Sequence, residues 1–458
     1  MSAPSSQLHK SVSLISGVRI PSKSPTTLWD ISISSDTIAS ISPHDHAAPH
    51  DPRTTLSATS QFLAPSLCHP HIHLDKPFLL SSPTYSDLTV HEGTFAEALD
   101  VTERAKARFT VEDLVTRGRR LIQESVAAGV TAMRAFVEVD GGVGMTCIEA
   151  GEMLKREFNG ICDVQLCAFA QLAVFSGEDD GEKVRRLMEE AVSREAVEVI
   201  GSTPYVESDL ERMKKNVEWA IDLSLRTGKH LDFHLDYNLD PDPEQEPLVW
   251  FVLSSLKAKD YAVRRREGQS VTFGHCTRLT LFTPAEWHRL QSEIAGLPIS
   301  FVGLPTSDLY MMGRPTASDD GGGQRVRGTL QIPQMVQEYG LWCAIGVNNV
   351  GNAFTPQGSC DPMALASLGM GVYQAGSERD CEVLYECVST RAKEVIGVED
   401  DTSLGLRVGR RADFVLFGRK VEDGEEEDWK TRRSISEIVR DAGSARTTVK
   451  GGQIVSQN

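Results

Sequence analysis

Long hydrophobic runs are missing from this sequence: no stretch of about 20 apolar residues occurs, so no segment predicts a helix that spans a bilayer. The opening residues, MSAPSSQLHKSVSL, lack the apolar core of a secretory signal. Basic residues are also few, because 47 Lys and Arg stand against 64 Asp and Glu, which gives a formal net charge of −17. A nucleic acid or an anionic membrane would require a basic face. The sequence therefore predicts neither of them as a partner.

Motifs of several common enzyme classes are absent as well. No Gly-x-Ser-x-Gly elbow occurs, so serine hydrolase chemistry has no support. The glycine-rich stretch SDDGGGQRVRG (318–328) lacks the Gly-Lys-Ser/Thr ending of a phosphate-binding loop. The nine cysteines are an odd number without a disulfide-framework spacing, which favours reduced thiols and a cytoplasmic protein.

Histidine, in contrast, is concentrated in one stretch, CHPHIHLDK (68–76), directly after an apolar run. Side chains alternate between the two faces of a strand, so His69, His71 and His73 project the same way if this stretch is extended. Neutral imidazole is the commonest metal ligand in proteins. The spacing therefore predicts a metal site. Asp75 and Lys76, just past the histidines, are either groups that orient the imidazoles or a surface ion pair, and we favour the first role for Asp75.

The order of apolar and amphipathic segments predicts the fold. Amphipathic stretches at 111–128, 182–192 and 209–226 carry apolar residues at helical spacing. The candidate strands between such stretches are 67–73, 130–139, 163–171, 197–205, 230–234, 271–276, 298–304 and 341–347. Eight strands alternating with helices predict an α/β protein in which residues 64–404 form a (β/α)8 TIM barrel.

The two ends of the chain show a different pattern. Short β-like runs separated by turns occupy 12–20, 29–33 and 37–41, and two more lie at 412–417 and 447–455. We expect residues 1–63 and 405–458 to form one small β-sandwich together.

In a (β/α)8 barrel the active site lies at the carboxyl ends of the strands. The predicted strands end in polar side chains that could meet there: His71, His73, Gln171, His234, His275 and Asn348. A single strand histidine is more often a hydrogen-bonded core residue, but four histidines at the ends of three strands predict a site.

These segments resemble the amidohydrolase superfamily, and most closely its cytosine deaminase-like branch. The matching stretches are HIHLDK (71–76), VTAMRAFVEVD (130–140), CDVQLCAFAQ (162–171), HLDFHLD (230–236), FGHCT (273–277), IGVNN (345–349) and GLRVGRRADFVLFG (405–418). The resemblance implies a metal-carrying barrel and a β-sandwich from both termini. It also implies metal ligation by His71, His73 and His234, a structural role for His69, a catalytic role for His275, and substrate binding by Gln171.

Two departures from the family pattern concern proton transfer. The strand-eight aspartate that ligates the metal and takes the proton of bound water is replaced by Asn348, whose amide can ligate but cannot act as a base. The glutamate three residues after the strand-five histidine is replaced by Tyr237, a group with an ordinary pKa near 10.

Three functions stay open. The first is metal-dependent hydrolysis of a C–N bond, by deamination or cyclic amide opening of a small nitrogen heterocycle, with proton transfer moved to Glu138, Asp236 or His275. The second is a non-hydrolytic lyase, isomerase or cyclase reaction with Tyr237 as donor. The third is a non-catalytic ligand-binding protein. We rank hydrolysis first, because the histidines and Gln171 are all retained.

Further expectations concern the substrate, the metal and the assembly. A loop after strand seven is predicted to bring Asp308, Tyr310 and Arg314 to the substrate. No lysine lies in or at the end of strand four (AVEVIGSTPYV, 196–206), so one metal ion is expected, either Zn²⁺ or Fe²⁺. The predicted partner is a small-molecule substrate, and the resemblance is compatible with a homo-oligomer.

Overall fold

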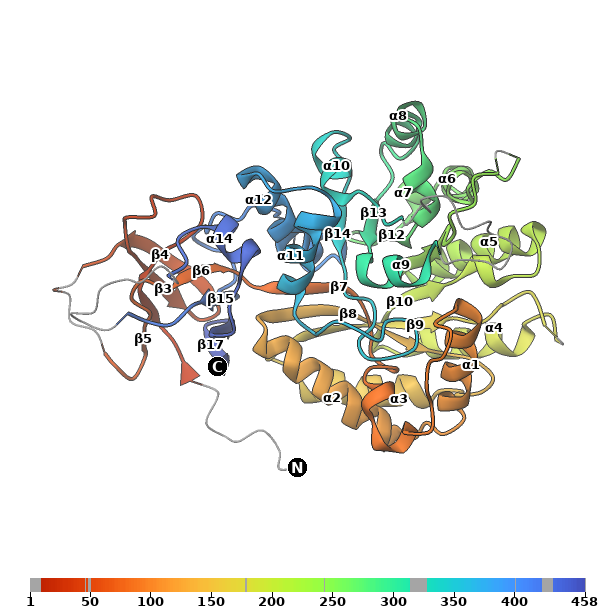
Figure 1. Ribbon diagram of the computed structural model, residues 1–458, viewed down its shortest axis with the longest axis horizontal. Helices are drawn as coiled ribbons and strands as arrows, with labels where there is room; N and C mark the ends of the chain where they lie inside the picture. The colour runs from red at the N-terminus through yellow and green to blue at the C-terminus, as the bar shows by residue number, and fades with distance from the viewer. Residues whose placement is uncertain are drawn as a thin grey trace.

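The computed structural model describes residues 10–45, 47, 51–177, 179–242, 244–313, 328–399, 401–421 and 431–457. Figure 1 shows a β-rich part, built from the red and blue ends of the chain, beside a larger part in which helices surround strands. Among the helices of these residues, none is long and apolar enough to cross a membrane.

The larger part is the predicted (β/α)8 barrel. Its eight strands pair in parallel in chain order: β7 (Leu67–His73), β8 (Val130–Glu138), β9 (Asp163–Ala170), β10 (Val197–Ser202), β11 (His230–Leu235), β12 (Val271–His275), β13 (Ile299–Gly303) and β14 (Cys343–Ile345). The barrel closes just past β14, where the backbone N–H of Asn348 donates to the His71 carbonyl at 3.1 Å and that of His73 donates to the Asn348 carbonyl at 2.8 Å. The fold class predicted from the sequence is confirmed.

Helices cover the outside of the barrel. They are α1 (Phe95–Lys106), α2 (Val111–Ala127), α3 (Thr146–Glu157), α4 (Glu182–Ser193), α5 (Leu210–Thr227), α6 (Val249–Ala258), α7 (Tyr261–Arg264), α8 (Pro284–Glu293), α9 (Pro305–Met311), α10 (Ile332–Gln337), α11 (Pro362–Val372), α12 (Glu378–Cys387), α13 (Thr390–Val395) and α14 (Ile435–Arg440). The sequence sets their starts: Thr110 and Asp209 accept the N–H groups of Asp113 and Arg212 and so cap α2 and α5.

Strand β10 ends earlier than the sequence pattern indicates. Pro204 begins a short 3₁₀ turn, η3 (Pro204–Val206), because proline cannot continue the ladder of hydrogen bonds. The other 3₁₀ turns are η1 (Leu79–Ser81), η2 (Pro83–Tyr85) and η4 (Thr277–Leu281).

Both ends of the chain build the β-rich part, as expected. One sheet has the order β1 (Lys10–Ser11), β17 (Gln453–Gln457), β16 (Arg446–Lys450), β15 (Phe414–Phe417) and β6 (Phe62–Pro65); the other has β4 (Thr37–Pro43), β3 (Trp29–Ser34), β2 (Leu14–Val18) and β5 (Thr55–Ser57). A separate hydrophobic core joins them, with Ile15 and Ile31 from one sheet and Phe414 and Ile454 from the other. This sandwich leads directly through β6 into β7, the strand that carries the histidine motif.

Candidate active site

Three histidines meet at the carboxyl end of the barrel. His71 and His73 lie on β7 and His234 lies on β11, and one ring nitrogen from each falls within 4.8 Å of the others. The Nε2 atoms of His73 and His234 are 3.4 Å apart. The rings of His71 and His234 lie against Phe136 and Phe169, with ring centroids 4.0 and 4.4 Å apart. The structure therefore brings together all three histidines that the sequence predicted as ligands.

The protonation state of this cluster suits a metal ion. Burial, together with repulsion from neighbouring cationic groups, holds the pKa of His71, His73 and His234 well below the ordinary histidine value. Both ring nitrogens of His71 are buried without a hydrogen-bond partner among the residues that the structure describes. Buried imidazole nitrogens that have no hydrogen-bond partner are costly unless a ligand such as a metal cation satisfies them. The donor set therefore fits a divalent metal.

Asn348 contributes an oxygen beside the histidines. Its Nδ2 donates to Ser307 Oγ at 2.7 Å, and Ser307 Oγ lies 2.5 Å from Thr355 Oγ1. Its Oδ1 is buried and has no partner within the described part of the chain. The amide is thus oriented with its nitrogen toward Ser307 and its oxygen free to ligate. No carboxylate joins this ligand cluster among the described residues.

His275 follows the ligands around the barrel and is held by Asp308. The His275 Nδ1 lies 2.8 Å from Asp308 Oδ1, and Thr329 Oγ1 donates to Asp308 Oδ2 at 2.7 Å. Asp308 was predicted to meet the substrate from a loop, and this is wrong. It lies on α9 with its side chain fully buried behind His275, because its carboxylate is used to fix the imidazole. Arg314 lies outside the described residues.

Tyr237 lines the cavity in front of the histidines, and its ring centroid is 4.0 Å from that of His275. Burial raises the pKa of Tyr237 well above its ordinary value, with the Asp308 charge adding to the shift. The hydroxyl is therefore protonated near neutral pH. It can donate a hydrogen bond there, but it cannot serve as a base.

The two carboxylates predicted as replacement bases do not line this cavity. Asp236 accepts the backbone N–H groups of Leu248 and Val249 at 2.7 and 3.0 Å, which holds it at the start of α6. Glu138 pairs with Lys76 and Lys106, and these ion pairs outweigh burial and lower the pKa of Glu138 to about 2. Both carboxylates are thus occupied by other partners, and neither is placed to take a proton at the histidine cluster.

Lys76, named in the sequence analysis beside Asp75, lines the cavity, which was not predicted from the sequence. The alternative prediction, that Asp75 and Lys76 form a surface ion pair, is wrong, because the two residues are only 2% and 1% exposed. Asp75 Oδ2 accepts the backbone N–H of Glu138 at 2.8 Å, and Lys76 lines the cavity beside Gln171. Gln171 lies where the sequence predicted it, at the end of β9. The signal that could have found Lys76 is its position three residues after His73, at the same strand end.

His69 does not project with the other two histidines, contrary to the strand argument. The pairing of β7 with β8 shifts register between His69 and Ile72, and Pro70 lies within this shift. His69 Nε2 consequently faces Ser125 Oγ of α2 at 3.0 Å. The bulge turns His69 toward the helix layer, so that only two histidines of the motif enter the site.

Backbone strain gathers at the same strand ends. Asp236, His275 and Asn348 all have positive φ, at 46°, 65° and 65°. Such conformations cost on the order of 1–3 kcal/mol in residues other than glycine and persist where packing enforces them. The close approach of β14 to β7 helps to enforce the positive φ of Asn348, because the backbones are so near that a Cβ on Gly346 would meet the His71 carbonyl oxygen at 3.1 Å.

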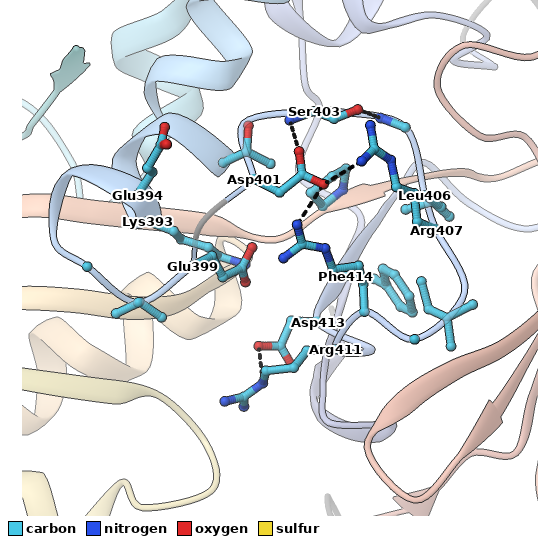
Figure 2. A pocket seen from close by; sticks show the side chains of 18 of the residues that line it. Lys393, Glu394, Glu399, Asp401, Ser403, Leu406, Arg407, Arg411, Asp413 and Phe414 are labelled. Carbon is cyan, nitrogen blue, oxygen red and sulfur yellow. Dashed lines mark hydrogen bonds and ion pairs between the residues drawn. The ribbon is translucent and has the colours of Figure 1, made fainter. Parts of the chain in front are cut away.

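A larger cavity lies at the opposite end of the barrel. It has a volume of about 620 Å³ and is bordered by Pro65, Gly268 and Trp342, which precede β7, β12 and β14. Its charged side chains pair with one another, as Figure 2 shows: Asp401 Oδ2 lies 3.4 and 2.9 Å from Arg407 and Arg410. Among the described residues that line it, there is no histidine or cysteine.

Known proteins resemble this chain in sequence and in fold. No family model matches the chain. It is 20% identical over 398 residues to N-isopropylammelide isopropyl amidohydrolase of Pseudomonas sp. (strain ADP), covering 85% of this chain and 87% of that protein.

Solved structures show the same fold. The 5-methylcytosine deaminase of Klebsiella pneumoniae superimposes with a TM-score of 0.80 at 21% identity, covering 97% of each chain. The zinc complex of atrazine chlorohydrolase from Arthrobacter aurescens has a TM-score of 0.63 at 17% identity, covering 97% of this chain and 95% of that one. The chain is therefore similar in sequence to an amidohydrolase and shares its fold with these solved structures.

Proposed function

We propose that this protein is a metal-dependent hydrolase that cleaves a C–N bond, by deamination or cyclic amide opening, in a small nitrogen heterocycle. The observation that carries the proposal is the buried, neutral cluster of His71, His73 and His234, in which neither ring nitrogen of His71 has a hydrogen-bond partner among the described residues. The similarity to an ammelide amidohydrolase and a methylcytosine deaminase supports the choice of a heterocyclic substrate.

One divalent metal ion would be held by His71, His73, His234 and the Oδ1 of Asn348. Zn²⁺ and Fe²⁺ both suit three imidazoles and an amide oxygen, and the zinc complex of a structural relative supports Zn²⁺. When bound, such an ion lowers the pKa of a coordinated water toward neutrality and polarises the bond that is attacked.

The chain's own residues would then complete the site. His275, fixed at Nδ1 by Asp308, presents its other nitrogen toward the cavity and can accept the proton that is released during attack. Tyr237, whose ring packs on that of His275, can donate a proton to the departing nitrogen. Its hydroxyl then regains a proton from solvent or from His275. Gln171 binds the substrate from the end of β9. Asp236 and Glu138 are not needed in this scheme, because their carboxylates are engaged elsewhere.

A non-hydrolytic reaction is the second candidate. It is favoured by one observation: no carboxylate lines the cavity within the described residues, so a hydrolase must manage without the usual base. A lyase, isomerase or cyclase using Tyr237 as donor would need none. A ligand-binding protein without catalysis is the third candidate, and the strained strand ends speak against it.

Several broader expectations stay proposals. We propose a cytoplasmic location, a small-molecule substrate as partner, and assembly as a homo-oligomer. We also propose the division into a sandwich domain of residues 1–63 and 405–458 and a barrel domain of residues 64–404, for which a core drawn only from sandwich residues gives support.

The test measures metal content and turnover together. Protein purified without chelator should carry about one Zn or Fe per chain by plasma mass spectrometry and should release ammonia, an amine or an opened ring from a panel of cyclic amides and amino-heterocycles. The His71→Ala/His73→Ala variant should lose the metal and at least about 1000-fold in rate. Metal-loaded protein that converts substrates without taking up oxygen from ¹⁸O-labelled water would favour the second candidate. Protein that binds no metal after reconstitution would overturn the proposal.

A further inference from the structure

Two buried threonines lie behind the candidate active site, 1% and 0% exposed and outside the lining of its cavity. We infer that these residues, Thr329 and Thr355, are positioning residues of the site. Each acts through one side chain of helix α9: Thr329 on the imidazole of His275, and Thr355 on the amide of Asn348. The inference rests on the proposed function for the roles of His275 and Asn348.

Helix α9 stands behind two neighbouring strand ends at once. It begins directly after β13, the strand that lies between β12 and β14 in the barrel. Ser307 and Asp308 are consecutive residues of its first turn, and both are buried. Consecutive side chains of a helix point roughly 100° apart, so the two residues serve different neighbours. Asp308 reaches His275 at the end of β12, and Ser307 reaches Asn348 just past β14.

Thr329 completes the hydrogen bonds of the Asp308 carboxylate. Asp308 Oδ1 accepts from His275 Nδ1 at 2.8 Å, and Asp308 Oδ2 accepts from the Thr329 hydroxyl at 2.7 Å. The other donor to Oδ2 among the described residues is the backbone N–H of Leu304 at 3.4 Å, which is longer than a usual hydrogen bond. Because a close donor bonds each oxygen, the carboxylate is held in one orientation.

This fixed carboxylate selects one tautomer of His275. An ionised carboxylate can only accept, so Nδ1 of the imidazole carries the hydrogen and Nε2 keeps its lone pair for the cavity. Without the Thr329 hydroxyl, Asp308 Oδ2 would be a buried acceptor without a close donor, which is costly. The carboxylate would then turn toward other donors, and the imidazole would no longer be confined to one tautomer.

Thr355 decides the direction of the hydrogen bond between Ser307 and Asn348. The Nδ2 of Asn348 lies 2.7 Å from Ser307 Oγ, which lies 2.5 Å from Thr355 Oγ1. A hydroxyl has one hydrogen to donate. When the Thr355 oxygen accepts that hydrogen, Ser307 can only accept from Asn348. The amide nitrogen therefore faces Ser307, and the amide oxygen faces the three histidines of the cluster.

Loss of the Thr355 oxygen would release the hydrogen of Ser307. Among the described residues, Asn348 is then the remaining partner of this hydroxyl, and a turned amide would accept the hydrogen through Oδ1. The NH₂ group would face the three histidines in place of the oxygen. An amide NH₂ group donates and does not ligate, so the site would bind a metal ion less tightly.

Isosteric substitutions separate the roles of the two threonines. Thr329→Val and Thr355→Val each replace a hydroxyl by a methyl group of similar size, and the matched controls Thr329→Ser and Thr355→Ser keep the hydroxyl. Two measurements on the full-length protein need no substrate. Zinc affinity is measured by competition with a chelator. The tautomer of His275 is measured by nuclear magnetic resonance of zinc-loaded protein labelled with ¹⁵N-histidine, with His275→Gln to assign the signal.

The two valine variants should affect different measurements. Thr355→Val should weaken zinc binding at least about tenfold and leave the Nδ1–H signal of His275 in place. Thr329→Val should lose that signal wholly or in part, while zinc affinity changes by less than about threefold. For any heterocycle that the wild type hydrolyses, Thr329→Val should lower kcat at least about tenfold and leave KM within about threefold. Both serine variants should behave as the wild type.

Several outcomes would overturn the inference. They are equal effects of the two valine variants on both measurements, valine variants that match the wild type, and serine variants that behave like their valine counterparts. If a valine variant fails to fold, the alanine variant at the same position also removes the hydroxyl and is measured in its place. If the expected pattern is found but no heterocycle is hydrolysed, the proposed function fails and this inference stands. If heterocycles are hydrolysed but the two measurements do not separate, the inference fails and the proposed function stands.

Discussion

The two ends of the barrel hold cavities of opposite character. At the amino ends of the strands, a cavity of about 620 Å³ is bordered by arginines and carboxylates that pair with one another. At the carboxyl ends, a cavity of about 20 Å³ is bordered by ring nitrogens, amide groups and an ammonium, several of which lack a protein partner. The comparison teaches that a cluster of unpaired polar groups indicates the reactive site better than the amount of open space does, because folded proteins seldom leave several buried polar groups unpaired at one place.

Removal of the Tyr237 hydroxyl should give the largest effect among the tests of this contrast. Tyr237→Phe keeps the ring against His275 and removes only the proton donor, so turnover should fall at least about tenfold. Metal content should stay at the wild-type level, as measured by plasma mass spectrometry. Unchanged turnover would remove Tyr237 from the mechanism and would leave His275 to handle both proton transfers.

A pH titration of unfolding stability should show that a histidine at the amino ends of the barrel strands has a structural role, in contrast to the histidines of the candidate active site. His230 begins β11 there, and its Nδ1 accepts the backbone N–H of Ser270 at 3.2 Å, which requires a neutral ring. Burial, assisted by the Arg134 charge, lowers the pKa of His230 to about 3. The unfolded chain binds this proton below about pH 6.5, so stability is complete above that value and is lost progressively as the pH falls toward 3.

The measurement is chemical denaturation of the wild type and His230→Gln at pH 7 and pH 5. The wild type should lose up to about 2 kcal/mol more than the variant between these two values. Parallel losses in both proteins would show that His230 is already charged in the folded state or that other groups control the acid response.

The smallest effect is expected in the large cavity itself. Asp401→Asn removes the ion pairs with Arg407 and Arg410, whose side chains are 62% and 39% exposed, and such pairs contribute about 0–1 kcal/mol. Turnover should remain within about twofold of the wild type, and the thermal midpoint should shift by only a few degrees. A loss of activity as large as that of Tyr237→Phe would contradict the contrast between the two cavities. It would assign a functional role to the cavity at the amino ends of the strands.

Much of the fold could be predicted from the sequence, because the apolar strands and the amphipathic helices each carry their own periodicity. The predicted strand 67–73 coincides with β7 (Leu67–His73), and α2 (Val111–Ala127) follows its predicted range to within one residue. Strand ends could be predicted less well. Strand β14 (Cys343–Ile345) is shorter than its apolar run, because the chain bends there to close the barrel against β7.

The candidate site was predictable where residue type alone carries the chemistry. His71, His73, His234 and His275 could be found because histidine at strand ends is uncommon outside functional sites. Asp308 was placed wrongly, because a sequence does not reveal whether a carboxylate faces a ligand or supports an imidazole from behind. Glu138 and Asp236 were proposed as bases for the same reason, since their partners come from distant segments.

The sequence by itself determined the barrel, the sandwich from both ends of the chain and the set of imidazoles, since hydrophobic periodicity and ligand chemistry are local properties. Only the tertiary structure decided which way each polar group faces. The bulge at Pro70 removed His69 from the site, Lys76 oriented the amide of Gln171, and Ser307 left the oxygen of Asn348 free. The partners that orient Gln171 and Asn348 lie 95 and 41 residues away along the chain, so these orientations appear only when the chain has closed.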